Sequence, residues 1–119
     1  MSEISEPLEA FLGYLRECVQ IYHIAEDEEA EADALTQDIL HSLELEQHDE
    51  GEYLALAREL VEARQKRRAA KDRLTMTAPV VGWVKDNQGV VKGMERLLGE
   101  IRKAEKSTEN RVYIPRVRK

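Results

Sequence analysis

Apolar side chains recur at alternating steps of three and four residues between positions 53 and 76. The series is Tyr53, Leu56, Leu60, Ala63, Ala70 and Leu74, with Arg67 in the one position where a further apolar residue is due. A spacing of about 3.5 residues is typical of helices that pack along their length. The opposite face carries Arg58, Arg64, Lys66, Arg68, Lys71 and Arg73. We therefore expect residues 52–78 to form one long amphipathic helix.

The N-terminal half carries a second series with the same spacing. Its members are Leu8, Phe11, Leu15, Cys18, Tyr22, Ala25, Glu29, Ala32, Thr36, Ile39 and Leu43. Ser5 can cap this helix, and neither Gly nor Pro occurs between Tyr14 and Glu50. Residues 6–48 are predicted to be helical. The helix is either continuous or broken near residues 23–28, where the apolar signal thins.

The stretch from Gln47 to Gly51 reads as a turn. If the flanking helices fold back antiparallel, the numbers of facing residues add to about 99, which places Leu43 opposite Leu56 and Thr36 opposite Ala63. The acidic run 26–33 then faces the basic run 66–73. The expected fold class is all-α, with a long antiparallel, coiled-coil-like helical hairpin.

The C-terminal third is expected to add further helices to the same domain. Pro79 should end or sharply kink the central helix, and an apolar stretch with the only Trp predicts a short helix over 79–86. A last helix is predicted over 90–106. Pro115 favours an extended, basic tail over 107–119. The whole is expected to be a four-helix-bundle-like single domain.

Charge is distributed very unevenly along the chain. Residues 1–52 carry a net −15 and residues 53–119 a net +9, which together give the chain its −6. Such asymmetry is found in interaction tails and also in folds that pair their own charges. The acidic start lacks the pattern of a signal peptide, no apolar run approaches the ~20 residues of a membrane span, and Cys18 is the only cysteine. We expect a cytoplasmic protein with a reduced thiol and no membrane association.

Basic side chains on the central helix and the tail are the candidates for binding nucleic-acid phosphates, where affinity depends on salt. They are Arg64, Arg68, Arg111, Arg116, Arg118 and Lys119. The competing interpretation is that the helix bases pair with the acidic run; the expected register favours it. The tail bases have no evident acidic partner in the sequence. The acidic run itself could mimic nucleic acid and occupy a basic site on another protein.

Chemically reactive patterns are scarce. Asp38 and His41 share a helix face, as in carboxylate-bridged metal sites, but the facing helix supplies no His. A polar contact between helices is therefore the favoured interpretation. Arg67 either fixes the register or reaches Glu31. Nucleophile, phosphate-loop and zinc motifs are absent from the sequence, so we expect no enzyme activity, no cofactor and no metal.

Several strings in the same order resemble a group of small, functionally uncharacterised proteins of phages and prophages of Gram-positive bacteria. They are TQDILH at 36–41, RQKRRAAKD at 64–72, APVV at 78–81, LLGEIRKAEK at 97–106 and ENRVYIPRV at 109–117. The resemblance covers about residues 35–117 and implies a phage setting and no enzyme activity. It also implies a recurring polar set, for which a helix-to-helix network is the economical explanation: Asp38, His41, Arg64, Arg68, Lys71, Asp72, Asn110 and Arg111.

These features lead to one functional expectation with two alternatives. The expected function is that of a non-enzymatic, phage-derived protein acting through protein–protein contacts with a phage or host protein. The alternatives are an accessory nucleic-acid-binding protein and an acidic inhibitor of a host nucleic-acid-binding protein. The first helix is longer than its partner, so Leu8 to Tyr22 need another cover, which is either the C-terminal helix or a second subunit. A homodimer that buries these residues is the favoured expectation.

Overall fold

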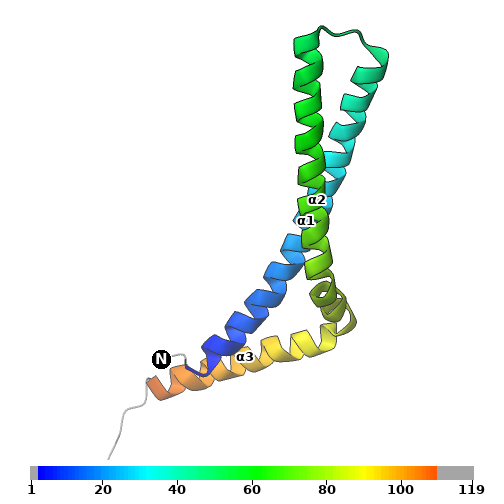
Figure 1. Cartoon of the computed structure of the whole chain (residues 1–119). Coiled ribbons are helices and arrows are strands. Elements are labelled where there is room, and N and C mark those ends of the chain that lie inside the picture. The colour runs from blue at the N-terminus through cyan, green and yellow to red at the C-terminus, as the bar shows by residue number, and fades with distance from the viewer. Residues whose placement is uncertain (1–2, 110–119) are drawn as a thin grey trace, which may run out of the picture. The chain divides into compact units, whose positions relative to one another are not determined.

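The computed structural model describes residues 3–109, and these residues are all-helical, as the sequence predicted. Helix α1 spans Ser5–Leu45, α2 spans Glu50–Asp86 and α3 spans Gln88–Glu109 (Figure 1). Only residues 3–4, 46–49 and 87 of the described range lie outside helices, and no strand occurs within it. The chain divides into two compact units. Of the described residues, one unit comprises 17–82, and the other comprises 3–16 together with 83–109.

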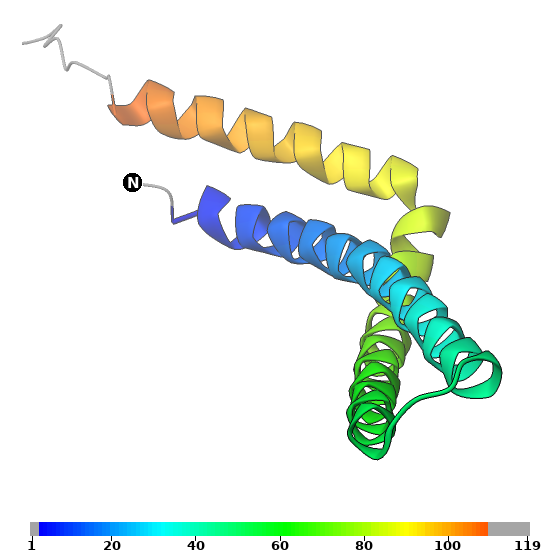
Figure 2. The ribbon, with the colours of Figure 1, turned by 90° about the horizontal axis from the view of Figure 1, so that it is seen from above.

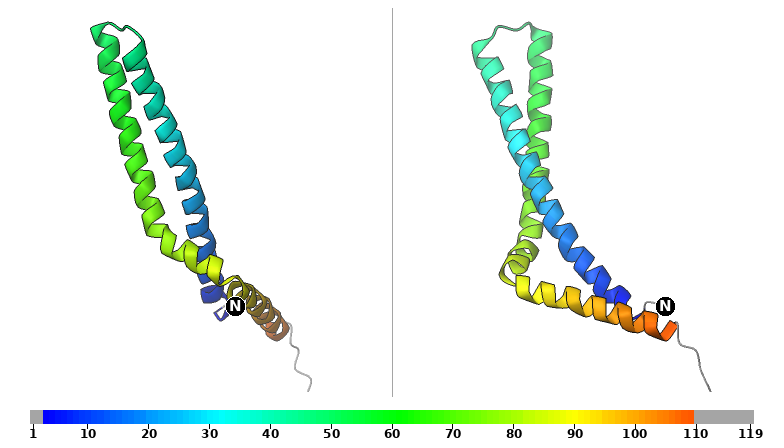
Figure 3. Two further views of the ribbon diagram at one scale, coloured as in Figure 1. Left: turned by 90° about the vertical axis from the view of Figure 1, so that its right-hand side faces the viewer. Right: turned by 180° about the vertical axis from the view of Figure 1, so that it is seen from behind.

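In the 17–82 unit, the C-terminal part of α1 and most of α2 lie side by side, as the views in Figures 1 and 3 agree. Ion pairs join Asp33 to Arg67 and Glu28 to Arg73, so residue numbers rise along one helix as they fall along the other. The seam between the helices consists mostly of small side chains. The buried residues are Cys18, Ala25, Ala32, Thr36, Ile39, Ala63, Ala70 and Thr77.

The loop of this unit is fixed by local hydrogen bonds at the start of α2. The Glu52 amide donates to Asp49 Oδ1 at 2.8 Å, and the Asp49 amide donates to Glu52 Oε1 at 3.0 Å. This reciprocal capping box satisfies two amides that the first helical turn leaves without partners. The His48 ring lies edge-on to the Tyr53 ring, with 5.2 Å between the ring centroids. The turn therefore occupies 46–49, and α2 begins at Glu50 rather than at residue 52.

In the other unit, α3 lies along the first turns of α1, as Figure 2 shows with α3 in yellow to orange and the start of α1 in blue. Arg102 forms an ion pair with Glu9 at 2.9 Å, and the Ser5 amide donates to Glu105 Oε2 at 3.2 Å. The buried apolar side chains are leucines, namely Leu12, Leu15 and Leu98. Helix α3 therefore covers Leu12 and Leu15 within one chain, without a second subunit.

The buried stripe at the start of α1 differs from the predicted series by one residue. Leu12 is only 1% exposed, whereas Phe11 is 44% exposed and stacks on the ring of Tyr14. A straight α-helix drifts by about 20° per heptad relative to a 3.5-residue repeat. A stripe extrapolated over several heptads therefore moves to the neighbouring residue.

Residues 50–109 contain two helices rather than the predicted three. Pro79 lies inside α2, and residues 79–86 continue that helix instead of forming a separate one. Proline removes one hydrogen-bond donor from a helix but does not prevent the next turn from forming. Two nearby threonines, Thr75 and Thr77, donate from their hydroxyls to the carbonyls of Lys71 and Arg73. The described residues therefore contain three helices, not four.

The structure decides between the two alternatives for the first helix and corrects the end of the last one. Helix α1 is continuous through residues 23–28, where a break was the alternative, and Ala25 there is buried in the seam. Helix α3 extends to Glu109, so residues 107–109, expected to belong to an extended tail, are helical. The rest of the predicted tail, residues 110–119, lies outside the described residues.

Candidate functional site

Two ion pairs mark the two sides of the α1–α2 seam in the 17–82 unit. On one side, Arg73 Nη2 lies 3.1 Å from Glu28 Oε1. On the other side, Arg67 Nε lies 2.6 Å from Asp33 Oδ1. Residues seven positions apart share a helix face, so each pair identifies the neighbours on its own side. We call these the Glu28 side and the Asp33 side.

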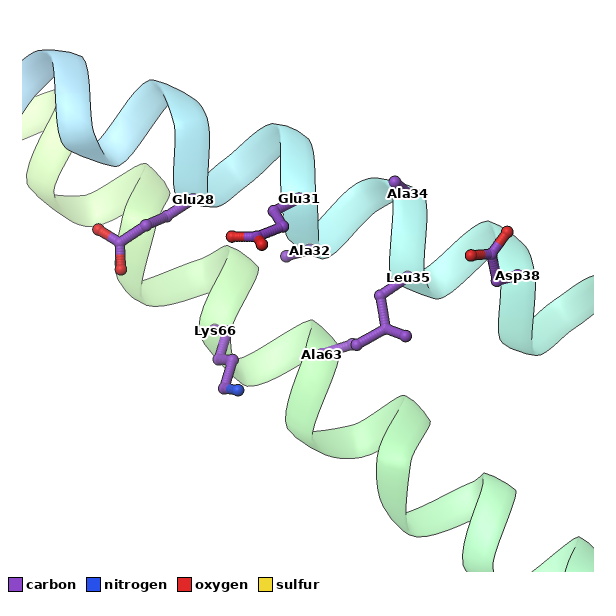
Figure 4. A pocket seen from close by; sticks show the side chains of 8 residues that line it. All are labelled: Glu28, Glu31, Ala32, Ala34, Leu35, Asp38, Ala63 and Lys66. Carbon is purple, nitrogen blue, oxygen red and sulfur yellow. The ribbon is translucent and has the colours of Figure 1, made fainter.

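A groove of about 570 Å³ runs along the Glu28 side, between α1 and α2 (Figure 4). Its base is formed by Ala32 and Ala63, which are both buried. Leu35 extends from α1 toward Ala63 of α2 and remains 42% exposed. The residues that line the groove are Glu28, Glu31, Ala32, Ala34, Leu35, Asp38, Ala63 and Lys66. The groove exists because alanines occupy adjoining positions of the seam, where larger side chains would fill the space.

The charge around the groove is predominantly negative. Glu28, Glu31 and Asp38 contribute three carboxylates from α1, and Lys66 contributes one ammonium group from α2. Within residues 3–109, neither Glu31 nor Asp38 forms an ion pair or a side-chain hydrogen bond. Two carboxylates therefore remain available to a cationic ligand, beside one exposed leucine.

Arg64 and Arg68, the helix residues predicted to bind nucleic acid, lie on the solvent-exposed surface of α2. They are one helical turn apart, and neither pairs with an acid in the part of the chain that the structure describes. The other predicted contacts fall outside the described residues, namely Arg111, Arg116, Arg118 and Lys119.

The predicted polar set does not come together as one network within residues 3–109. Asp38, His41 and Asp72 are exposed, Lys71 is half-buried, and none of their four side chains has a hydrogen bond or an ion pair there. Arg67 does bridge the two helices, but to Asp33 and not to Glu31. The reason is geometric, because Glu31 lies on the groove side of α1. Asn110 lies outside the described residues.

Sequence reasoning missed two features of the seam. One is the groove, whose signal was the combination of alanines in the seam with an apolar Leu35 beside it. The other is the environment of Glu29, which the periodicity had already placed in the seam: its Oε2 atom is buried without a hydrogen-bond partner among the described residues. Burying an unpaired polar atom costs about 1–3 kcal/mol, so Glu29 weakens the seam that it occupies.

Other kinds of site find little support in residues 3–109. No group of three or more His, Cys, Asp or Glu side chains is arranged to hold a metal ion there. No helix in that range is long and apolar enough to cross a membrane.

No protein-family model, curated protein or solved structure matches this chain.

Proposed function

We propose that this chain is a non-enzymatic protein of phage or prophage origin that acts through protein–protein contacts in the host cytoplasm. We further propose that residues 17–82 act as an antiparallel, coiled-coil-like hairpin whose groove binds a basic amphipathic helix of a partner protein. The observation that carries the proposal is the composition of the groove, with an apolar side chain and carboxylates around an alanine base.

The apolar part of the groove suits a helical ligand. Helix-in-groove recognition uses apolar anchors at spacings of three, four and seven residues. Ala32 and Ala63 let a third helix approach the seam closely, and Leu35 offers an exposed apolar contact beside them. An apolar anchor of the partner would contact Leu35 and thereby remove its exposed surface from water, which contributes about 25 cal/mol per Å².

The carboxylates of the groove favour a ligand that carries positive charge. Glu31 and Asp38 are seven residues apart on α1, which is about two helical turns or roughly 10 Å. Lysines or arginines at positions i and i+7 of a partner helix match that spacing. Such rim charges act mainly on the association rate and on specificity, so binding should weaken as salt rises.

The test is fluorescence anisotropy with a labelled peptide of about 14 residues, roughly four helical turns. The peptide carries leucines at i, i+3 and i+7 and lysines on the flanks. A peptide of identical composition in scrambled order is the first control. We expect saturable binding to the full chain at low salt, and a Kd at least about tenfold higher for the scrambled peptide.

Variants of the chain locate the binding site. Leu35→Gln and the double variant Glu31→Gln/Asp38→Asn should each raise the Kd by about tenfold. Glu44→Gln removes an exposed carboxylate of α1 that does not line the groove, and should leave the Kd unchanged. Equal losses in all three variants, or no binding of the ordered peptide, would overturn the proposal.

Nucleic-acid binding is the second candidate, because Arg64 and Arg68 are exposed and unpaired within the described residues. Its test is anisotropy with labelled single- and double-stranded DNA at about 50 and about 200 mM salt. Binding through these residues predicts a steep loss of affinity with salt and a shallower salt dependence for Arg64→Gln/Arg68→Gln. The acidic-inhibitor alternative predicts no DNA binding and capture of a basic protein instead, which the peptide assay also measures.

A further inference from the structure

Large apolar side chains also lie on the side of the hairpin away from the groove. Leu40 follows Asp33 by seven residues, and Leu60 and Tyr53 precede Arg67 by seven and fourteen. All three therefore lie on the Asp33 side. Leu40 is 42% exposed, Tyr53 is exposed, and Leu60 is half-buried. We call the surface formed by Leu40, Tyr53, Ala57, Leu60 and Arg64 the Leu40 face.

The same side carries charges of opposite sign on the two helices. On α1, Glu26 and Asp33 precede Leu40 by fourteen and seven residues. On α2, Arg64 and Lys71 are separated by seven residues, and neither forms an ion pair within residues 3–109. On this side Asp33 is paired with Arg67 across the seam and Glu26 contacts His23 of its own helix, whereas Arg64 and Lys71 keep their charges without an ion pair within residues 3–109, so α2 carries surplus base.

We propose that the Leu40 face binds a second copy of this chain, and that the two hairpins form a four-helix dimer. Each α1 then contacts α2 of its own chain and α2 of the other copy, so no acidic helix lies beside another acidic helix. In a dimer whose two-fold axis runs parallel to the helices, equivalent residues of the two copies lie at the same level along that axis. Numbers of facing residues from different copies then add to about 100, as they do for Asp33 and Arg67 within one chain.

That arrangement places apolar side chains against apolar ones near the loops and acids against bases farther from them. Near the loops, Leu40 of one copy meets Leu60 of the other, and both become buried. Farther from the loops, Glu26 and Asp33 of one copy meet Lys71 and Arg64 of the other. The opposite arrangement, α1 against α1, would place acids against acids, which is disfavoured. Charge complementarity therefore selects both the second copy as the occupant and its orientation.

The dimer leaves the groove on the Glu28 side open, so self-association and peptide binding are separable. Leu35 and Leu40 supply a matched pair for this purpose, because both are on α1 and both are 42% exposed. Sedimentation equilibrium of the full chain should show a monomer–dimer equilibrium that shifts toward monomer as salt rises. Leu40→Gln should raise the dimer Kd by about tenfold or more and leave peptide affinity unchanged, whereas Leu35→Gln should do the reverse.

The orientation has its own readout in the full chain with Cys18→Ala. A spin label at Gln47→Cys in the loop measures the distance between the two loops. The proposed dimer places both loops at the same end, with a label separation below about 30 Å. In the opposite orientation, two hairpins that overlap along their whole length would have their loops roughly 40 Å or more apart, because α1 rises about 1.5 Å per residue from Glu17 to Leu45.

Three results would overturn the inference. They are a chain that stays monomeric at all concentrations, a dimer that Leu40→Gln and Leu35→Gln weaken equally, and a loop separation of roughly 40 Å or more. Circular dichroism of both variants checks that the helices are retained. A dimer that forms without peptide binding supports the inference and contradicts the proposed function, so the two can fail independently.

Discussion

The two units of this chain are both built from paired helices, but their seams are filled with different side chains. In residues 1–16 and 83–109, Leu12, Leu15 and Leu98 are buried. In residues 17–82, the seam consists mainly of alanines and threonines, with Ile39 as its one large buried aliphatic side chain among the described residues. Burial of a leucine contributes about 1.5–3 kcal/mol, and an alanine contributes far less. The alanine seam therefore gains less from hydrophobic burial, and it leaves Leu35 and Leu40 exposed.

This difference connects packing with the proposed function. Small seam residues permit close approach of two helices but leave larger side chains on the flanks. We propose that residues 17–82 bury their remaining apolar surface by binding a partner. We expect the leucine-filled seam of residues 3–16 and 83–109 to be stable without a partner. We expect the alanine-filled seam of residues 17–82 to bind one.

The largest expected effect is a cavity in the leucine seam. Leu12→Ala removes a side chain that is 1% exposed and should lower the free energy of unfolding by about 2–4 kcal/mol. Trp83, the only tryptophan, belongs to the same unit, so its fluorescence reports the transition in urea. Leu97→Ala, at an exposed position of α3, is the control and should cost less than about 1 kcal/mol. Similar losses for the two variants would show that Leu12 is not packed as described.

The opposite substitution tests the alanine seam. Ala70 is fully buried, so Ala70→Leu should overpack the seam and destabilise the chain by about 1–3 kcal/mol. Far-UV circular dichroism during thermal unfolding measures the loss. Ala69→Leu adds the same volume at the exposed neighbouring position and should change the stability little. If Ala70→Leu were neutral or stabilising, the seam would be looser than the structure indicates.

A smaller effect, of opposite sign, is expected at Glu29. Replacing this carboxylate by leucine removes the buried Oε2 atom that lacks a partner within residues 3–109 and adds apolar burial. Glu29→Leu should raise the free energy of unfolding by about 1 kcal/mol. Urea denaturation of Glu29→Leu beside Glu44→Leu, an exposed position on the same helix, separates seam burial from general helix propensity. Destabilisation by Glu29→Leu would mean that the carboxylate stabilises the seam.

The smallest effect is a pH-dependent change in stability from the contact between Ser5 of α1 and Glu105 of α3. Hydrogen bonding, first from the Ser5 side chain and also from its amide, lowers the pKa of Glu105 from its ordinary value of 4.5. A lowered carboxylate pKa stabilises the fold above that ordinary value, and the contribution disappears as pH falls through the lowered pKa. Glu105→Gln should therefore lower the Tm slightly at neutral pH and leave it unchanged in acid. Glu100→Gln, an exposed carboxylate of α3, is the control and should leave the Tm unchanged at both pH values.

Helical periodicity determined much of the fold. The spacing of three and four residues identified Ala25, Ala32, Thr36, Ile39, Ala63 and Ala70 as seam positions, and all six are buried. The turn was found because Asp49 and Gly51 interrupt two long periodic series. These features are local, since the backbone repeat alone decides which side chains share a face.

The tertiary structure decided which neighbour each face meets. It paired Arg67 with Asp33 instead of Glu31, because the two acids lie on opposite sides of the same seam. It placed Leu12 rather than Phe11 under α3, and it carried α2 through Pro79. It also formed the groove beside Leu35, because the lining of that groove comes from both α1 and α2. A periodic sequence specifies the faces of a helix to within about one residue, because a straight helix drifts relative to a 3.5-residue repeat. The choice between two adjacent side chains is made only by the packed partner, because close packing depends on which side-chain volume fits against it.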